Sequence, residues 1–275
     1  GRADQIKSMG DYITIDIEGF NLIIIRDTKK KFHCFANTCM HRGARLLSGN
    51  GKCKGIRCPF HSWFYDLEGN LISVPGIESL KRLNKKHYRL KEYKIKEYMG
   101  FLFVSLSKNP ITLKNYLGNF YDVHAYWPLK SLRTFSRRSQ KVNCNWKSFL
   151  EVFNEYYHLP AVHPTSVNSI YNLPLKPDKV TGAFTSQFGS TTGTGGLLQN
   201  QQENVLPNMS GLDKLVSSGV RYTWLFPNMT FAANADALWM YESYPIGPSQ
   251  CQIFQTICFP PETFLVKNFR LKAGK

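Results

Sequence analysis

Residues 39–41 read Cys-Met-His and residues 58–61 read Cys-Pro-Phe-His, so that together they form the pattern C-x-H-x16-C-x2-H. Two thiolates and two imidazoles are the ligands of a [2Fe–2S] cluster in which one iron binds the sulfurs and the other binds the nitrogens. Each half of the pattern then supplies one ligand to each iron. We therefore expect the two halves to lie on two neighbouring loops, the second of which is stiffened by Pro59.

The alternative interpretation of the same four residues is a structural zinc site, because zinc also accepts two Cys and two His ligands. Zinc fingers usually pair like with like, as C-x2-C followed by H-x3-H, whereas each half of this pattern is mixed. Residues 58–70, CPFHSWFYDLEGN, closely resemble the second cluster loop of Rieske proteins, usually CPYHGW followed by a D-x-x-G turn. Met40 stands where Pro is frequent and Ser62 where Gly is usual, but neither change removes a ligand. The pattern favours the cluster.

Length and composition restrict the remaining possibilities. The 275 residues are enough for two domains with substantial cores. No apolar run reaches the roughly 18 residues that a membrane helix needs, and the first residues lack the apolar stretch of a signal peptide. Cysteines outside the pattern show no paired spacing, which suits the reducing cytoplasm: Cys34, Cys53, Cys144, Cys251 and Cys258. We expect a cytoplasmic protein that does not act in a membrane.

The formal net charge is +16, and eight of the basic residues fall between Lys81 and Lys96. A solvated face is the default interpretation of such a run. A functional alternative is a docking surface for an acidic electron donor, since opposite charge speeds association. Nucleic acid is the third alternative, and no recognisable nucleic-acid-binding motif accompanies the charge. We expect no nucleic-acid partner.

The first part of the chain predicts a small all-β domain over residues 1–108, with the cluster loops at about 37–70. Apolar and β-branched runs at residues 12–15 and 21–26 predict two strands joined through Glu18-Gly19. Residues 88–95 alternate and residues 101–106 are apolar, which predicts two more strands.

Residues 109–275 predict an α+β domain. The periodicity from Trp146 to His158 predicts a helix that Pro160 ends. A stretch rich in Gly, Ser, Thr and Asn, from about residue 186 to 218, predicts a mobile loop, and its Gly193-Thr194-Gly195-Gly196 lacks the context of a phosphate-binding loop. Three further strands are expected at residues 222–226, 229–233 and 252–257.

A second group of metal-binding residue types lies in the predicted helix. Glu151, Glu155 and His158 are spaced i, i+4, i+7 and so share one helical face, and His163 follows just beyond Pro160. Two histidines with one carboxylate form the facial triad of mononuclear non-haem Fe(II) sites, which leaves positions open for dioxygen. Structural histidines or a zinc site are the alternatives for this segment taken alone.

With both groups considered together, the chain resembles the α (oxygenase) subunits of Rieske non-haem iron oxygenases. Their iron-site helix reads NW-x(3,4)-E-x(3)-E/D-x2-H-x4-H-P, and the matching residues are Asn145, Trp146, Glu155, His158, His163 and Pro164. The specific resemblance covers roughly residues 30–165. It implies an α+β chain with an N-terminal all-β Rieske domain and a C-terminal helix-grip catalytic domain, usually in a homotrimer in which one subunit's cluster lies next to its neighbour's iron.

The resemblance also implies roles. Cys39 and Cys58 hold one cluster iron, and His41 and His61 hold the other. His158 and His163 bind the catalytic iron. Glu155 accepts hydrogen bonds from an iron-ligand histidine and from a cluster histidine across the subunit interface, and so serves as the catalytic second-layer carboxylate.

The third iron ligand of that family is an Asp in a C-terminal helix, and no carboxylate occurs in the last dozen residues of this chain. We expect that the C-terminal helix with this Asp is missing from the sequence. The alternative is that an internal acid such as Asp236 replaces it.

The expected function is that of an oxygenase component. Electrons from NAD(P)H arrive through a separate reductase or ferredoxin, pass the [2Fe–2S] cluster and reach a mononuclear Fe(II), which activates O2 on a small organic substrate. Hydroxylation or oxidative demethylation of a quaternary amine is slightly favoured, because aromatic side chains can hold methylammonium groups and are abundant in the second half: Tyr156, Tyr222, Trp224, Phe226, Phe231, Trp239 and Tyr241. Aromatic-ring dihydroxylation is the alternative. Alternatives of other classes are a Rieske electron carrier without catalytic iron and a zinc-dependent nucleic-acid binder.

Overall fold

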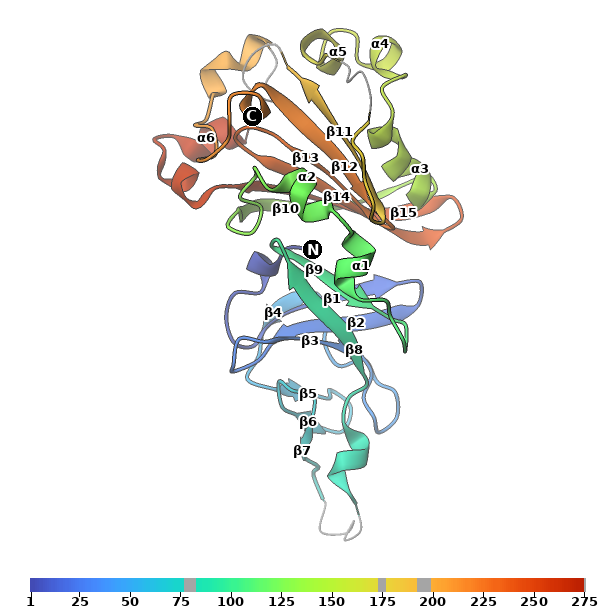
Figure 1. Cartoon of the computed structure of the whole chain (residues 1–275). Coiled ribbons are helices and arrows are strands. Elements are labelled where there is room, and N and C mark those ends of the chain that lie inside the picture. The colour runs from blue at the N-terminus through green and yellow to red at the C-terminus, as the bar shows by residue number, and fades with distance from the viewer. Residues whose placement is uncertain (77–82, 173–176, 192–198, 275) are drawn as a thin grey trace. The chain divides into compact units, whose positions relative to one another are not determined.

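The computed structural model describes residues 1–76, 83–172, 177–191 and 199–274, and the chain divides into two compact units, Gly1–Pro110 and Ile111–Lys275 (Figure 1). Each unit has its own sheet and its own buried core. The predicted α+β class, with an all-β first part, is confirmed.

Unit 1 consists of two antiparallel sheets. The larger has the strand order β4-β1-β2-β3-β8-β9, and the smaller has the order β5-β6-β7. The strands are β1 (Asp11–Ile17), β2 (Phe20–Arg26), β3 (Phe32–Ala36), β4 (Asn50–Lys52), β5 (Ile56–Arg57), β6 (Phe64–Tyr65), β7 (Leu71–Ser73), β8 (Glu92–Tyr98) and β9 (Phe101–Ser105). The β1–β2 hairpin turns at Glu18 and Gly19, which both have positive φ, as a two-residue hairpin turn requires.

The core of unit 1 forms beneath the two cluster loops. Ile23 and Ile25 of β2 pack with Phe35 of β3, with Tyr65 of β6 and with Trp63 just before β6, and all five are at most 5% exposed. The same cluster of buried residues includes the thiols of Cys39 and Cys58. The cysteine ends of both loops are therefore fixed by the core.

One predicted strand in unit 1 begins later in the structure than the sequence indicated. Residues 88–95 were expected to be extended, but Lys85–Tyr88 is a 3-10 turn and β8 begins only at Glu92. Asn84 caps that turn, because its side chain accepts a hydrogen bond from the backbone N–H of Lys86. Lys81 and Arg82 of the basic run lie outside the described residues.

Unit 2 is an antiparallel sheet of six strands with short helices. The strand order is β10-β15-β14-β13-β12-β11. The strands are β10 (Arg133–Val142), β11 (Phe184–Ser190), β12 (Gly219–Leu225), β13 (Met229–Ala233), β14 (Leu238–Gly247) and β15 (Gln250–Phe259). The helices are α1 (Leu113–Leu117), α2 (Phe120–His124), α3 (Trp146–Glu151), α4 (Leu159–Val162), α5 (Val167–Ile170) and α6 (Phe269–Ala273). Helix α3 packs on β14 and β15.

The prediction of one helix from Trp146 to His158 was wrong. Helix α3 ends at Glu151, a 3-10 turn covers Val152–Asn154, and Glu155 is extended with φ −131° and ψ 155°. The Asn154 amide donates to the backbone carbonyl of Leu150 at 3.1 Å, a local bond that competes with helical pairing. Pro160 does not end a helix but lies in the first turn of α4, where a missing N–H costs nothing.

The predicted mobile loop at residues 186–218 was partly wrong. Its first residues belong to β11, which pairs with β12 from Phe184↔Leu225 to Ser190↔Gly219. Aromatic side chains at Phe184 and Phe188 give this polar stretch enough packing to hold it in the sheet. Two 3-10 turns follow, Gln199–Asn204 and Val216–Ser218. Residues 193–196 lie outside the described residues.

Candidate metal centres

The two cysteine–histidine loops of unit 1 share one backbone geometry. Cys39 N–H donates to the Ala44 carbonyl at 2.8 Å, and Cys58 N–H donates to the Trp63 carbonyl at 2.8 Å. In each loop the fourth residue after the cysteine donates back to the cysteine carbonyl at 3.0 Å, and this residue is Gly43 or Ser62. Both have positive φ, 75° and 58°. Ser62 thus takes a left-handed conformation that favours glycine.

Polar side chains behind the loops hold them in place. The Asn37 side-chain oxygen accepts from the N–H groups of Leu46 and Leu47 at 3.1 and 2.9 Å. After the second loop, the Asp66 carboxylate accepts from the N–H groups of Glu68 and Asn70 at 2.9 and 2.8 Å. This is the turn that the D-x-x-G spacing predicts, and Gly69 closes it with φ 84°.

The four predicted ligand side chains divide into a buried pair and an exposed pair. Both thiols are 2% exposed, whereas both imidazoles are exposed. The rings of His41 and His61 lie 4.7 Å apart between centroids, and His41 stacks on Trp63. The loops therefore present a buried pair of sulfurs and an exposed pair of nitrogens. This donor set fits a [2Fe–2S] cluster with one inner and one outer iron.

Tyr65 is a contact to this site that the sequence did not single out. Its hydroxyl lies 3.3 Å from Cys39 Sγ and accepts from the Met40 N–H at 3.1 Å. Burial, followed by the contact with Cys39, raises the pKa of Tyr65, so the hydroxyl keeps its proton and donates to the sulfur. Tyr65 lies 26 residues from Cys39, and nothing in its local sequence marks it.

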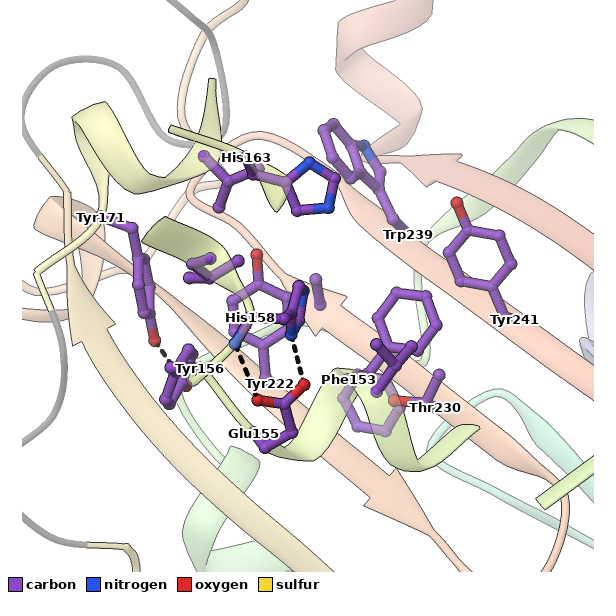
Figure 2. Close-up of a pocket in the computed structure, with 15 residues that line it drawn as sticks. Phe153, Glu155, Tyr156, His158, His163, Tyr171, Tyr222, Thr230, Trp239 and Tyr241 are labelled. Carbon is purple, nitrogen blue, oxygen red and sulfur yellow. Dashed lines mark hydrogen bonds and ion pairs between the residues drawn. The ribbon is translucent and has the colours of Figure 1, made fainter. Parts of the chain in front are cut away.

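In unit 2 the structure brings His158, His163 and Glu155 together at a cavity of about 250 Å³. The two imidazole centroids lie 5.5 Å apart. Figure 2 shows Glu155 below His158, joined to it by two contacts. One is between Glu155 and His158 Nδ1, and the other is a 3.2 Å bond from the His158 backbone N–H.

The Glu155 contact determines which histidine nitrogen is available. When Nδ1–H donates to the carboxylate, Nε2 is left unprotonated and able to bind a metal. Burial raises the pKa of Glu155, but the bonds from the His158 side chain and backbone outweigh it and hold the pKa below its usual value. The carboxylate is therefore ionised at neutral pH and orients the ring.

Seven of the fifteen residues that line the cavity are Phe, Tyr or Trp (Figure 2). Five of the seven aromatic residues singled out in the sequence line it, namely Tyr156, Tyr222, Phe231, Trp239 and Tyr241, whereas Trp224 and Phe226 do not. The structure adds two more, Phe153 and Tyr171. The Tyr156 and Tyr171 hydroxyls bond at 2.8 Å, and Gln255 donates to the Tyr241 hydroxyl at 2.8 Å.

No third ligand joins the two histidines within the part of the chain that the structure describes, where no three His, Cys, Asp or Glu residues form a metal-binding group. Asp236 lies in the turn between β13 and β14 and does not line the cavity. Burial raises its pKa to about 6. The predicted cluster site does not require three protein ligands around one metal ion, since each iron of a Rieske cluster takes only two protein ligands.

These two sites define a protein of the Rieske non-haem iron class. Residues 1–93 match the family model of the Rieske [2Fe-2S] domain, and residues 121–273 match that of the ring hydroxylating alpha subunit (catalytic domain). The chain belongs to this family of Rieske oxygenase α subunits. Membership implies a [2Fe–2S] cluster in the Rieske domain and a mononuclear iron in the catalytic domain.

Curated relatives act on quaternary ammonium compounds, as their names state. The chain is 32% identical over 171 residues to the carnitine monooxygenase oxygenase subunit of Acinetobacter baumannii, covering 61% of this chain and 46% of that protein. It is 30% identical over 188 residues to the glycine betaine monooxygenase oxygenase subunit of Pseudomonas aeruginosa, covering 68% and 43%. The chain thus spans about half the length of the curated relatives it matches.

Solved structures share the fold. The quaternary ammonium Rieske monooxygenase CntA in complex with L-carnitine matches with a TM-score of 0.76 and 22% identity, over 98% of this chain and 72% of that one. Naphthalene 1,2-dioxygenase with indole bound matches with a TM-score of 0.77 and 20% identity, over 96% of this chain and 67% of that one.

Among the described residues, no helix has the length and apolar character needed to cross a bilayer.

Proposed function

We propose that this chain is the oxygenase component of a multicomponent system that oxidises a small quaternary ammonium compound. Cys39, His41, Cys58 and His61 would hold the cluster, which would take electrons that come from NAD(P)H through a separate reductase or ferredoxin. His158 and His163 would hold the iron, which would supply O2 activation when bound. Residues 1–108 form the Rieske domain and residues 109–275 the catalytic domain in this proposal.

Within this scheme, the chain's own residues orient the histidine that would bind the iron. Glu155 holds the proton of His158 Nδ1 and so directs Nε2 toward the metal. In a homotrimer, usual in the family, Glu155 would also accept a hydrogen bond from a cluster histidine of the neighbouring subunit. The cysteines outside the ligand set form no disulfides among the described residues, which supports a reducing, cytoplasmic location.

The observation that carries the substrate proposal is the aromatic wall around the two histidines. Aromatic faces attract a methylated ammonium group by cation–π interaction, worth about 0.5–2 kcal/mol for each ring. The cavity of about 250 Å³ lies near the lower limit of ligand pockets, which favours a small substrate. Choline, glycine betaine and carnitine are of this size, and the names of the relatives support the same class.

The test compares choline with its uncharged carbon isostere, 3,3-dimethylbutan-1-ol, in an O2-uptake assay with reductase and NADH. Trp239→Leu or Tyr241→Leu is expected to raise KM for choline by roughly 3- to 30-fold and to change KM for the isostere much less. Trp224→Leu, a nearby residue that does not line the cavity, is the matched control. Equal losses for both compounds would contradict ammonium recognition by the wall.

Aromatic-ring dihydroxylation is the second candidate, supported by the apolar cavity lining and by the fold shared with naphthalene 1,2-dioxygenase. Formation of a diol from naphthalene, with no turnover of any quaternary amine, would favour it. A Rieske electron carrier would instead contain two irons per chain and keep its redox activity after His158→Ala.

A further inference from the structure

Two cysteines that the metal centres do not use lie in contact in unit 2. Cys144 lies between β10 and the Asn145 cap of α3, whereas Cys251 is the second residue of β15. Their sulfur atoms are 3.8 Å apart. Cys251 is completely buried, and Cys144 is half-buried. These residues are separated by 107 positions in the sequence, so only the folded sheet brings them together.

The sheet register explains the contact. Val142 of β10 pairs with Cys251 of β15, and the chain then turns from β10 toward α3. Two further contacts attach this turn to the hairpin between β14 and β15. Gln250 Nε2 donates to Asn143 Oδ1 at 3.0 Å, and Asn145 Nδ2 donates to the Pro248 carbonyl at 2.8 Å. Cys144 is thereby held between two attached neighbours.

We propose that Cys144 and Cys251 form a reversible disulfide when the protein meets hydrogen peroxide. The half-buried Cys144 thiolate attacks the peroxide, which yields a sulfenic acid on Cys144 and one water or hydroxide. The Cys251 thiol then displaces the sulfenic oxygen as a second water, and the S–S bond forms. Two thiols lose two electrons and two protons, and one peroxide is reduced to two waters.

The geometry allows this bond with a small local movement. A disulfide has a length of about 2.05 Å, so the two sulfurs must approach by roughly 1.7 Å. Both side-chain contacts beside Cys144 are solvent-exposed, and water can replace them while the turn moves. Burial and the neighbouring Cys251 thiol raise the pKa of Cys144, so only a small fraction of the thiol is ionised at neutral pH and its reaction with peroxide is slow.

The bridge is expected to act on the iron pocket through α3. Cys144 lies directly before Asn145, the residue that caps α3, and the segment after α3 supplies Val152, Phe153 and Glu155 to the cavity wall. A covalent bond between Cys144 and β15 fixes the beginning of this segment against the sheet. The oxidised chain should therefore have a higher thermal midpoint than the reduced chain.

Peptide mapping of the full chain tests the proposal. The purified protein is treated with hydrogen peroxide, alkylated in acid and denaturant, and digested with trypsin and chymotrypsin. Trypsin releases Cys144 between Lys141 and Lys147, and chymotrypsin cleaves at Phe254 and so separates Cys251 from Cys258. The expected product is a dithiothreitol-sensitive peptide that joins Cys144 to Cys251, present on monomeric protein in a non-reducing gel.

Variants of single cysteines show whether the bridge forms between Cys144 and Cys251. The linked peptide and the rise in thermal midpoint should disappear in Cys144→Ser and in Cys251→Ala, and both should persist in Cys258→Ala, which removes another buried thiol of β15. Oxidation of Cys144 to sulfinic acid without a bridge would overturn the proposal. So would a bridge between two chains, or one that appears only after the protein is unfolded.

Discussion

Replacing Tyr65 with phenylalanine is expected to lower the reduction potential of the [2Fe–2S] cluster. The Tyr65 hydroxyl lies 3.3 Å from Cys39 Sγ, and a metal-bound thiolate has no proton, so the hydroxyl is the donor. Reduction adds negative charge to the cluster and its sulfurs. The hydrogen bond therefore stabilises the reduced state more than the oxidised state, and its loss disfavours reduction.

The size of the effect follows from the energy of that bond. A hydrogen bond to a charged group contributes about 1.5–3 kcal/mol, and we take the difference between the two redox states as about 1 kcal/mol. For a one-electron couple, a tenfold change of about 1.4 kcal/mol equals about 59 mV, so the potential should fall by about 40 mV. The Met40 N–H also loses its acceptor, which should destabilise unit 1 by about 1–3 kcal/mol.

A redox titration followed by visible absorption and EPR measures the shift. Tyr88→Phe is the matched control, because it removes a tyrosine hydroxyl from the same core cluster of residues, where the ring of Tyr88 contacts Trp63. Both proteins must retain the cluster's EPR signal and two cluster irons. An unchanged or higher potential in the Tyr65 variant would refute the reasoning.

Three other outcomes are expected. His158→Ala should reduce the iron content from three to two per chain in metal analysis and abolish substrate oxidation, because one of two protein ligands is lost. Ser62→Gly should stabilise unit 1 by about 0.5–1 kcal/mol in thermal melts, because Ser62 has φ 58°; a lower midpoint would contradict this. Burial raises the pKa values of Asp27 and Glu92, but hydrogen bonds from His33, together with backbone N–H groups at Asp27 and Arg89 at Glu92, outweigh it and hold both below their usual values. Carboxyls with depressed pKa values stabilise the fold above the unfolded pKa and lose this as pH falls, so melts should show stability decreasing below about pH 4, and less steeply in His33→Gln.

Sequence spacing predicted the local parts of both sites well. Each cysteine–histidine pair lies within one hydrogen-bonded loop of about five residues, so the ligand spacing and the loop conformation are recorded together in the sequence. The same holds for the Asp66 turn and for the hairpin at Glu18-Gly19. His158 and His163 also lie close enough along the chain for one short helix to bring them together.

The conformation around Glu155 shows why periodicity was insufficient. The i, i+4, i+7 spacing predicted a shared helical face, and Glu155 does contact His158, but through an extended residue between two short helices. Packing against β14 and the local bond from Asn154 decide where α3 ends. The contact between Glu155 and His158 was therefore predicted correctly, although the continuous helix from which it was predicted is wrong.

By itself, the sequence indicated the candidate donor groups of this protein: two thiolates and two imidazoles in a pattern typical of a cluster, and two histidines with a carboxylate in a pattern typical of a second metal site. The members of each motif lie close together along the chain, so their spacing can be recognised in the sequence. Only the tertiary structure decided what surrounds them. Tyr65 reaches Cys39 across 26 residues, Cys144 meets Cys251 across 107, and the aromatic wall is gathered from three strands and the segment after α3. Such contacts depend on strand order and register, which arise from packing of the whole sheet and leave no local signal in the chain.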